Sequence, residues 1–408
     1  MLDGLLVLDL SRVLAGPYCT QLLADLGATV VKVEAPGGDE TRAWGPPFTG
    51  GESGYFLSVN RGKRSLAVDL KNPAGANLVR ELALKADVLV ENFKTGDLQR
   101  YGLDYEGLAP LNRRLVYLSI TGYGQTGPRA HEAGYDAAMQ AQTGFMAMTG
   151  EPGGGSVKLP VALIDVLTGT HAAVSVLAAL QRRAATGEGA HLDISLYDVA
   201  FASMVNQAQS VLLTGAAPRR LGSAHPNIVP YQAFTAADGE VVIAVGNDAQ
   251  FRKLCSVLGV EELGTDERFA TNAARVANRE TLLGLLRPLV GALSRAELVE
   301  RCVAAGIPTT AVETLPEALN DAQALARGVV VTGTHPTAGE LRMIASPMWH
   351  VTGTDGQPVG PTPAPGAAPV PPLLGEHVDE VLGGLLGLSA EAIDELVGSG
   401  AVRRRVQP

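Results

Sequence analysis

The sequence predicts an α/β protein with a large Rossmann-like domain, built on a mostly parallel sheet, and a smaller α+β domain. The first observation is that short apolar runs alternate with helical patterns in the first half of the chain. Such alternation produces a parallel sheet with helices on both faces. The second observation is size: 408 residues with 46% hydrophobic residues are enough for two domains.

Four strands are expected in the first half, over residues 5–10, 29–34, 87–91 and 114–120. Helical patterns fill the spaces between them, over residues 17–26 and 74–85, and Gly27 ends the first helix. Ligands of parallel sheets bind beyond the carboxyl ends of the strands. The loops that follow the strands are therefore the places where a site is expected, at residues 11–16, 34–45, 92–96 and 121–127.

The second half predicts the smaller domain and a return to the first. A helical stretch over residues 197–213 leads into a linker at 215–218. A strand and two helices follow, at residues 240–245, 280–293 and 295–305, and a Pro-, Gly- and Ala-rich connector at 355–372 precedes two last helices at 378–386 and 390–398. The predicted division is the first part of the large domain (1–200), a linker helix and loop (201–226), the small α+β domain (227–325), and a linker and C-terminal part returning to the large domain (326–408).

Composition excludes several classes of function. The net charge of −10 and pI near 5.3 argue against nucleic acid as a partner, because phosphate binding needs a basic surface. Cys19, Cys255 and Cys302 match no zinc or redox spacing, so we expect reduced thiols in a cytoplasmic protein. We expect no signal peptide, and no apolar run approaches the length of a membrane span.

Common catalytic motifs are missing from the sequence. The seven histidines show no metal-ligand spacing, so no metal is expected. There is no Gly-x-Ser-x-Gly elbow of a serine hydrolase. The first strand is not followed by Gly-x-Gly-x-x-Gly, so the usual dinucleotide fingerprint is absent although the sheet is of the nucleotide-binding kind.

Asp165 is the strongest candidate for chemistry. An apolar run over residues 159–164, interpreted as a strand, ends in this carboxylate, and a small-residue helical pattern follows from Thr168. At such a corner the helix dipole would keep the carboxylate ionised, and a carboxylate held there can act as a nucleophile. The local pattern by itself favours an ordinary helix N-cap instead, since Asp is a common capping residue.

Three other segments carry candidate binding residues. In the first loop, Arg12 and the small residues Ala15 and Gly16 would let a bulky ligand approach the backbone before a helix; a tight turn with a surface arginine is the alternative. A basic cluster of Arg61, Lys63, Arg64 and Lys71 could hold phosphates, or form a solvated turn.

The third segment contains Tyr135 and Asp136, followed by Gln140 and Gln142. Polar residues in such a small-residue stretch indicate a lined cleft, with a core aromatic at Tyr135 as the alternative reading. The run of three glycines at 153–155 lacks the lysine of a P-loop, which favours a surface loop.

Together these segments resemble the family III CoA-transferases, also called the formyl-CoA transferase/carnitine CoA-transferase family. The resemblance covers essentially the whole chain, and its motifs are specific because they all occur in the right order. They lie at residues 8–17, 26–28, 31–34, 63–71, 91–93, 119–124, 134–136, around Asp165, and at 372–377.

The resemblance implies a two-domain subunit, with the small domain inserted in the large one, and an interlocked homodimer. It implies that Asp165 is a nucleophile that forms an acyl anhydride and then an aspartyl-CoA thioester. Coenzyme A and acyl-CoA would be substrates, with no tightly bound cofactor. The residues predicted to contact CoA are Arg12, Val13, Leu14, Ala15, Val68, Lys71, Asn92, Phe93, Lys94, Arg100, Gly134, Tyr135 and Asp136.

The chain also departs from that family's pattern. Formyl-CoA transferases carry Gln where this chain has Leu14, so backbone N–H groups of the Ala15–Gly16 turn would have to stabilise the oxyanion. They carry a basic residue where this chain has Ala35 and Pro36, and Arg42 is expected to compensate.

Residues 221–232 resemble the branch that includes succinyl-CoA–glutarate CoA-transferases, which favours a short dicarboxylic acid as acceptor. We expect His225, with Arg219 and Arg220, near the acceptor pocket, and Tyr135 as a second substrate contact. Two alternatives stay open. The first is an α-methylacyl-CoA racemase, although racemases carry His where this chain has Tyr135, and Tyr is a poor base near neutral pH. The second is a CoA-binding protein without catalysis.

Overall fold

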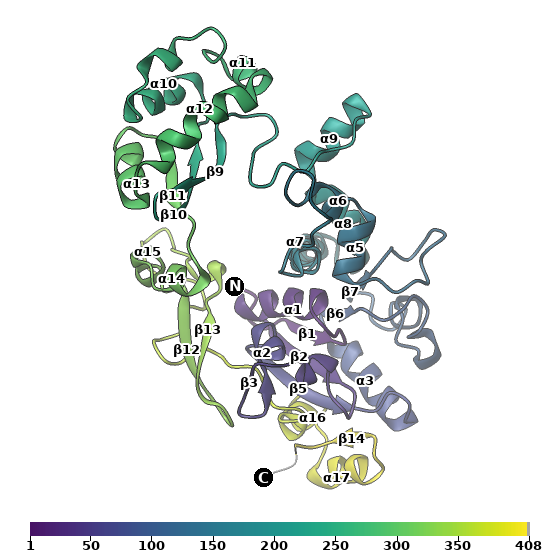
Figure 1. Cartoon of the computed structure of the whole chain (residues 1–408). Coiled ribbons are helices and arrows are strands. Elements are labelled where there is room, and N and C mark those ends of the chain that lie inside the picture. Colours follow the sequence, from purple (N-terminus) through teal and green to yellow (C-terminus); the bar gives the residue numbers. More distant parts are fainter. Residues whose placement is uncertain (406–408) are drawn as a thin grey trace. The chain divides into compact units, whose positions relative to one another are not determined.

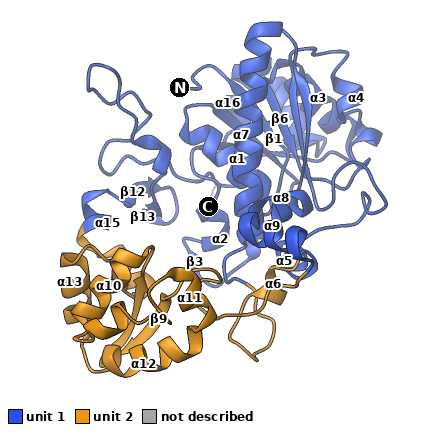
Figure 2. Cartoon of the chain, turned by 90° about the horizontal axis from the view of Figure 1, so that it is seen from above, with its two compact units in different colours: residues 1–143, 159–215, 323–408 blue, residues 144–158, 216–322 orange. Residues whose placement is uncertain are grey.

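The computed structural model describes residues 1–405, which form two compact units (Figure 2). Unit 1 comprises Met1–Thr143, Leu159–Gly215 and the described residues from Gln323 onward, and unit 2 comprises Gly144–Lys158 and Ala216–Ala322. Residues 144–158 thus differ from the predicted division, because they are held by the later part of unit 2. The Gly222 N–H donates to the Gly150 carbonyl (2.9 Å), and Arg220 donates to Ser156 Oγ (3.0 Å).

A seven-stranded sheet forms the centre of unit 1, in the order β14-β5-β2-β1-β6-β7-β8 (Figure 1). Six strands are parallel and β14 pairs antiparallel with β5, so the predicted mostly parallel sheet is confirmed. Without β14, this is the strand order of dinucleotide-binding folds, which reverses between β1 and β6. The strands are β1 (Leu6–Asp9), β2 (Thr29–Glu34), β5 (Lys63–Val68), β6 (Val88–Glu91), β7 (Val116–Thr121), β8 (Ala190–Ser195) and β14 (Val402–Arg403).

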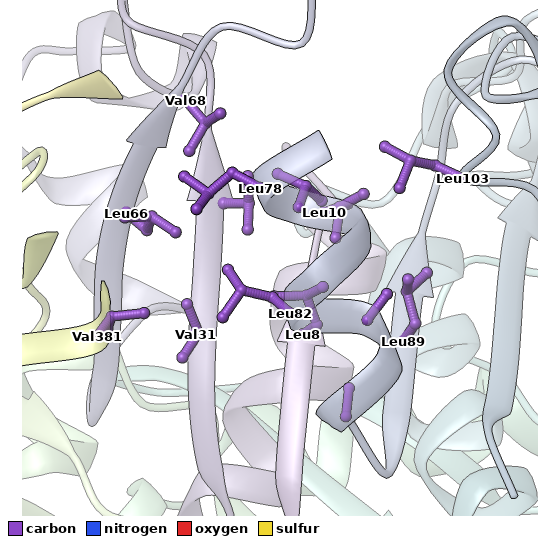
Figure 3. Packing of buried hydrophobic residues seen from close by; sticks show 14 of the residues in the cluster. Leu8, Leu10, Val31, Leu66, Val68, Leu78, Leu82, Leu89, Leu103 and Val381 are labelled. Atoms are coloured by element: carbon purple, nitrogen blue, oxygen red, sulfur yellow. The ribbon is translucent and has the colours of Figure 1, made fainter. Parts of the chain in front are cut away.

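Helices cover the sheet, and their ends follow from local sequence. Helix α3 (Pro73–Lys85) starts where the Asn72 side chain accepts from the Ala74 N–H and Pro73 occupies the first turn. Its Leu78 and Leu82 pack over strand residues such as Leu8 and Leu66 (Figure 3). The remaining helices of unit 1 are α1 (Ala15–Asp25), α2 (Gly54–Ser58), α4 (Tyr105–Leu108), α5 (Asp136–Gln142), α7 (Leu163–Thr186), α8 (Leu196–Ser203), α9 (Val205–Thr214), α16 (Val378–Leu386) and α17 (Ala390–Gly398).

Helix α7 packs closely on α1. A Cβ atom at Gly169 would lie 2.6 Å from the Ala15 carbonyl oxygen, so only glycine permits this approach. By length and composition α7 is apolar enough to cross a membrane, which the sequence reading did not anticipate; a packed core helix meets the same criteria. The helix predicted over residues 197–213 is divided at Met204 into α8 and α9.

Unit 2 is built on a three-stranded antiparallel sheet in the order β11-β10-β9. A separate apolar core, with Phe234, Phe251 and Leu286 among its members, lies between this sheet and its helices. The elements of unit 2 are α6 (Phe145–Met148), β9 (Tyr231–Ala236), β10 (Gly239–Ala244), α10 (Asp248–Val257), α11 (Asn272–Ala277), α12 (Arg279–Gly291), α13 (Arg295–Ala304), β11 (Thr309–Ala311) and α14 (Leu315–Leu319).

Short elements complete the chain. Helix α15 (Ala322–Ala326) lies where unit 2 returns to unit 1, and two hairpins belong to unit 1. Cys19, Cys255 and Cys302 are buried free thiols. The hairpin strands are β3 (Phe48–Thr49) with β4 (Glu52–Ser53), and β12 (Val330–His335) with β13 (Gly339–Ile344).

Candidate active site

The loops after β1 and β6 are joined at the point where the strand order reverses. The Arg12 N–H donates to Asn92 Oδ1 (3.0 Å), and Asn92 Nδ2 donates back to the Arg12 carbonyl (2.7 Å). The Asn92 side chain thus forms hydrogen bonds with both the N–H and the carbonyl group of Arg12, which holds the two loops together. Ligands of open parallel sheets bind at this reversal.

A cavity of about 160 Å³ opens at these loops. Its walls also come from the end of β7, where Gly122 and Gly134 pass so closely that a Cβ at Gly134 would lie 2.5 Å from the Gly122 Cα. The structure brings ten predicted site residues together in its lining: Arg12, Val13, Leu14, Ala15, Asn92, Phe93, Lys94, Gly134, Tyr135 and Asp165.

A second cavity, of about 370 Å³, adjoins the first, since Arg12, Glu40 and Phe93 line both. Its lining includes the predicted residues Val68, Lys71 and Arg100. Lys71 and Arg100 place two cationic side chains at this end of the site. Asp165 lines the first cavity and not the second, so these two cationic side chains lie away from it.

Asp165 lies in the first turn of α7 and is 9% exposed. The predicted strand before it is wrong: residues 159–162 form no strand, because α7 already begins at Leu163. The N-cap alternative is also wrong. The carboxylate that accepts from the first turn belongs to Asp136 on α5, which takes the N–H groups of Ile164 (2.7 Å) and Asp165 (3.4 Å).

The charge state of Asp165 differs from the expectation. Burial, and then the nearby Asp136 carboxylate, raises the pKa of Asp165 to about 7. A helix N-terminus stabilises a negative charge by only about 0.3–1 kcal/mol, and Asp136 already accepts from this one. Desolvation therefore outweighs the dipole, and the helix start does not keep the pKa of Asp165 low, contrary to the expectation that it holds this carboxylate ionised.

Asp136 was predicted to contact CoA, but its side chain does not line the cavity. Its side chain is buried, and Gln140 Nε2 donates to its second oxygen (2.6 Å). The structure thus assigns Asp136 to the start of α7 rather than to the cavity lining. Its neighbour Tyr135 is 64% exposed at the cavity, so the core-aromatic alternative is wrong.

Tyr55 is an electrostatic neighbour of Asp165 that the sequence analysis missed. Burial and then the charge of Asp165 raise the pKa of Tyr55 to about 12, so its phenol stays protonated beside the carboxylates. The Trp44 ring meets it edge-on, with centroids 5.2 Å apart. Nothing in the local pattern around Tyr55 marks it, because its neighbourhood with Asp165 arises only in the folded chain.

The predicted basic cluster is largely wrong. Lys63 is buried and pairs with Asp9 (3.1 Å), while Arg61 is buried and pairs with Asp25 (2.5 Å). Arg64 pairs with Glu380 on the surface, which leaves Lys71 as the member that lines a cavity.

Arg42 likewise does not compensate for a missing basic residue after β2. It pairs with Glu34 (2.8 Å) and Glu52 (3.0 Å), and its guanidinium lies over the Phe56 ring. Its charge is therefore already matched within the fold.

His225 belongs to unit 2, where its ring stacks on Tyr231 at 5.3 Å and its carbonyl accepts from Arg279 (2.8 Å). Its proximity to the acceptor stays a prediction. Within residues 1–405, no group of three His, Cys, Asp or Glu side chains could hold a metal ion.

Comparisons with known proteins match nearly the whole chain. The model of the family described as CoA-transferase family III matches residues 2–368. The chain is 47% identical to "Succinate--glutarate CoA-transferase" of Agrobacterium fabrum over 337 residues, 81% of this chain and 84% of that protein. It is 41% identical to "Succinyl-CoA:glutarate CoA-transferase" of Mus musculus over 404 residues, 99% of this chain and 90% of that protein.

Solved structures agree as well. A CAIB/BAIF family protein from Brucella suis superimposes with a TM-score of 0.81 and 43% identity, covering 94% of this chain and 99% of that one.

Proposed function

Since the chain belongs to CoA-transferase family III, we propose that it moves CoA from succinyl-CoA to a short dicarboxylic acid. The observation that carries the proposal is Asp165, a buried carboxyl group with a pKa near 7 that faces the cavity formed by the β1 and β6 loops. Relatives named for transfer between succinate and glutarate support the choice of substrates.

In the first half of the proposed reaction, ionised Asp165 attacks the thioester carbonyl of succinyl-CoA. The C–S bond breaks, which gives a succinyl–aspartyl anhydride and CoA thiolate. The thiolate then attacks the aspartyl carbonyl, releasing succinate and leaving an aspartyl-CoA thioester. A desolvated carboxylate with a raised pKa is a better nucleophile than an exposed one, and covalent catalysis needs its ionised form.

The second half runs the same steps in reverse order. The acceptor carboxylate attacks the aspartyl thioester, which gives an acceptor–aspartyl anhydride and CoA thiolate. The thiolate attacks the acceptor carbonyl, forming the new acyl-CoA and restoring Asp165. Each step exchanges one activated acyl group for another, so little free energy is lost, provided that water is excluded from the anhydride.

The start of α1 supplies candidate donors for the oxyanions of these steps. Its N-cap, Leu14, makes no side-chain capping hydrogen bond, and Ala15 lines the Asp165 cavity. The N–H groups of Ala15 and Gly16 belong to the four at a helix start that lack an intrahelical acceptor. We propose that they stabilise the oxyanion in place of a side-chain amide.

Cationic side chains in the two cavities suit the phosphates of CoA. Lys71 and Arg100 line the second cavity, and Lys94 lines the first. Ammonium and guanidinium groups bind phosphate oxygens by charge-assisted hydrogen bonds. We propose that the nucleotide end of CoA lies here, with the thioester toward Asp165.

A groove in unit 2 supports recognition of the second carboxylate of the acceptor. Arg219, Arg220 and Arg279 line it, together with the carboxylate of Glu280. Replacing Arg219 by Ala should raise KM for glutarate more than for a monocarboxylic acid of the same length. An unchanged acceptor preference in both Arg219→Ala and His225→Ala would contradict this assignment.

We also propose that the protein is a homodimer with interlocked chains. Helix α9 exposes Leu212 and Leu213 by more than three quarters, and α7 exposes Val174. Exposed apolar side chains on these two helices favour burial against a second copy. Light scattering should give twice the chain mass, and the double variant Leu212→Glu/Leu213→Glu should shift it toward the monomer; a wild-type monomer would contradict the proposal.

A transfer assay tests the proposed reaction. Wild-type protein with succinyl-CoA and a panel of acids should form glutaryl-CoA or a related dicarboxylyl-CoA, and Asp165→Ala should form none. Deuterium exchange at the α-carbon of a branched acyl-CoA, without CoA transfer, would instead indicate racemisation. Binding of CoA with neither activity would indicate a protein without catalysis.

A further inference from the structure

Val13 is held in an unfavourable backbone conformation at the wall of the Asp165 cavity. Its φ is +70°, in the left-handed region, and across residues 1–405 only Val205 among the other non-glycine residues shares a positive φ. For a β-branched residue this conformation is a genuine outlier. Such strain persists only where the surroundings impose it, and it gathers at functional sites.

A buried ion pair is hydrogen-bonded to the backbone at Val13 and at Ser11. The Val13 N–H donates to the Asp39 carboxylate (3.2 Å), and Lys32 Nζ donates to the Ser11 carbonyl (2.8 Å). Lys32 and Asp39 also pair with each other at 3.0 Å, with both side chains almost wholly buried. The pair thus forms hydrogen bonds with the loop on both sides of Arg12, and the backbone N–H and carbonyl of Arg12 are hydrogen-bonded to Asn92.

The ion pair is itself rigidly held. Asp39 accepts from the Thr41 N–H (3.0 Å) and Thr41 Oγ1 (2.7 Å), and its own N–H donates to Glu34 (3.1 Å). Burial raises the pKa of Asp39, but the charge of Lys32 and the Thr41 hydrogen bonds lower it by more, so the carboxylate is ionised. An ionised acceptor binds an N–H group more strongly than a neutral one.

We propose that the Lys32–Asp39 ion pair is a positioning device for the reaction at Asp165: it fixes Val13 in the left-handed conformation and so sets the cavity wall formed by residues 12–15. This inference rests on the proposed function for its effect on transfer. Neither Lys32 nor Asp39 touches the reacting atoms in this scheme. Both side chains also line the second cavity. The positioning effect passes through the backbone of Val13, which lines the first cavity.

The test is a mutant cycle between Asp39 and Val13. Asp39→Asn is made in the wild-type, Val13→Ala and Val13→Gly backgrounds. Both changes at position 13 remove the isopropyl group, but only glycine adopts a positive φ without steric strain. We expect Asp39→Asn to lower kcat/KM for succinyl-CoA about tenfold in the wild-type and Val13→Ala backgrounds, and at most about twofold in Val13→Gly. KM for the acceptor acid should change less than KM for succinyl-CoA.

Two further variants make the result decisive. Asp25→Asn breaks another buried ion pair, with Arg61, and its effect on kcat/KM should be the same in all three backgrounds. Lys32→Gln removes the same pair as Asp39→Asn from the other side and should repeat its pattern, which keeps the test available if Asp39→Asn fails to fold.

An equal effect of Asp39→Asn in the alanine and glycine backgrounds, or no loss in the wild-type background, would overturn the proposal. The dissociation constant of CoA, measured by calorimetry in the same variants, should show the same pattern. This binding measurement separates the positioning role from the proposed function. If Asp165→Ala keeps full transfer, the proposed function fails. The coupling between Asp39 and Val13 in CoA binding still decides whether the ion pair positions the loop.

Discussion

Two regions of unit 1 each contain a buried carboxyl group, and the pKa values of these two groups are shifted in opposite directions. Burial raises the pKa of Asp9, but the charges of Lys63 and Lys32 lower it by more, so its pKa lies below the ordinary value. Asp165 has no cation among the causes of its shift; burial and Asp136 both raise its pKa, to about 7. The cationic partners of Asp9 therefore decide the direction in which its pKa moves, and Asp165 has no such partner.

The loop after β1 connects these two regions. The Ser11 N–H and hydroxyl donate to Asp9 (3.0 and 2.5 Å), while Val13, two residues later, lines the cavity of Asp165. The charges around Asp9 thus hold the loop in place, whereas the carboxyl group of Asp165 has no cationic partner and is available for chemistry. Variants that exchange these properties test the comparison.

The largest expected effect is loss of transfer in Asp165→Asn. The amide has nearly the shape of the carboxyl group but cannot form the anhydride, so kcat should fall by about 10⁴-fold or more, as for other covalent nucleophiles. Steady-state production of the new acyl-CoA measures it. Substantial residual transfer that survives careful exclusion of deamidation to Asp would show that another group carries the acyl chain.

Asp9→Asn should have the opposite signature. It leaves the fully buried Lys63 without its carboxylate partner, and breaking a buried ion pair in this way costs about 3–5 kcal/mol of unfolding free energy. Urea denaturation measures that loss. At urea concentrations below its unfolding midpoint, Asp9→Asn should keep far more transfer activity than Asp165→Asn. Equal losses of activity in the two variants would contradict the distinction between the two regions.

The pH profile sharpens the difference further. Attack requires ionised Asp165, so kcat/KM for succinyl-CoA should rise about tenfold per pH unit below pH 7 and level off above it. Glu91 is also buried, with its pKa raised to about 7 by burial first, so Glu91→Gln is the necessary control. If the rising limb disappears in Glu91→Gln, it belongs to Glu91 and not to Asp165.

The smallest expected effect is on stability. Because the folded pKa of Asp165 exceeds its unfolded value, near 3.8, folding favours the protonated form. That contribution is complete below about pH 4 and is lost as pH rises through 7. Asp165→Asn removes the titration, so its unfolding free energy relative to wild type should increase between pH 5 and pH 8, by on the order of 2–4 kcal/mol. A difference independent of pH would contradict the raised pKa.

The sequence predicted the parallel sheet and the loops that build the site because apolar runs and turn residues are local signals. It also singled out Asp165, whose segment marks a helix start. It could not supply the environment of that residue: the carboxylate that accepts from the first turn of α7 is Asp136, 29 positions earlier in the chain. Partners so far apart in sequence leave no periodic pattern.

Charged residues misled the sequence reading for the same reason. Arg61 and Lys63 stand next to a turn, which favours a solvated cluster, yet their partners Asp25 and Asp9 come from other segments and allow them to be buried. Tyr55 gives no local signal either, because its neighbourhood with Asp165 is created by the fold.

Trapping the covalent intermediate tests the central claim most directly. Wild-type protein is incubated with succinyl-CoA without acceptor, treated with borohydride or hydroxylamine, digested and analysed by mass spectrometry. The account predicts modification of the Asp165 side chain, as the reduced alcohol or the hydroxamate, and an unmodified peptide in Asp165→Asn. Transfer activity with the trapped group on a different residue, or with Asp165 never modified, would contradict it.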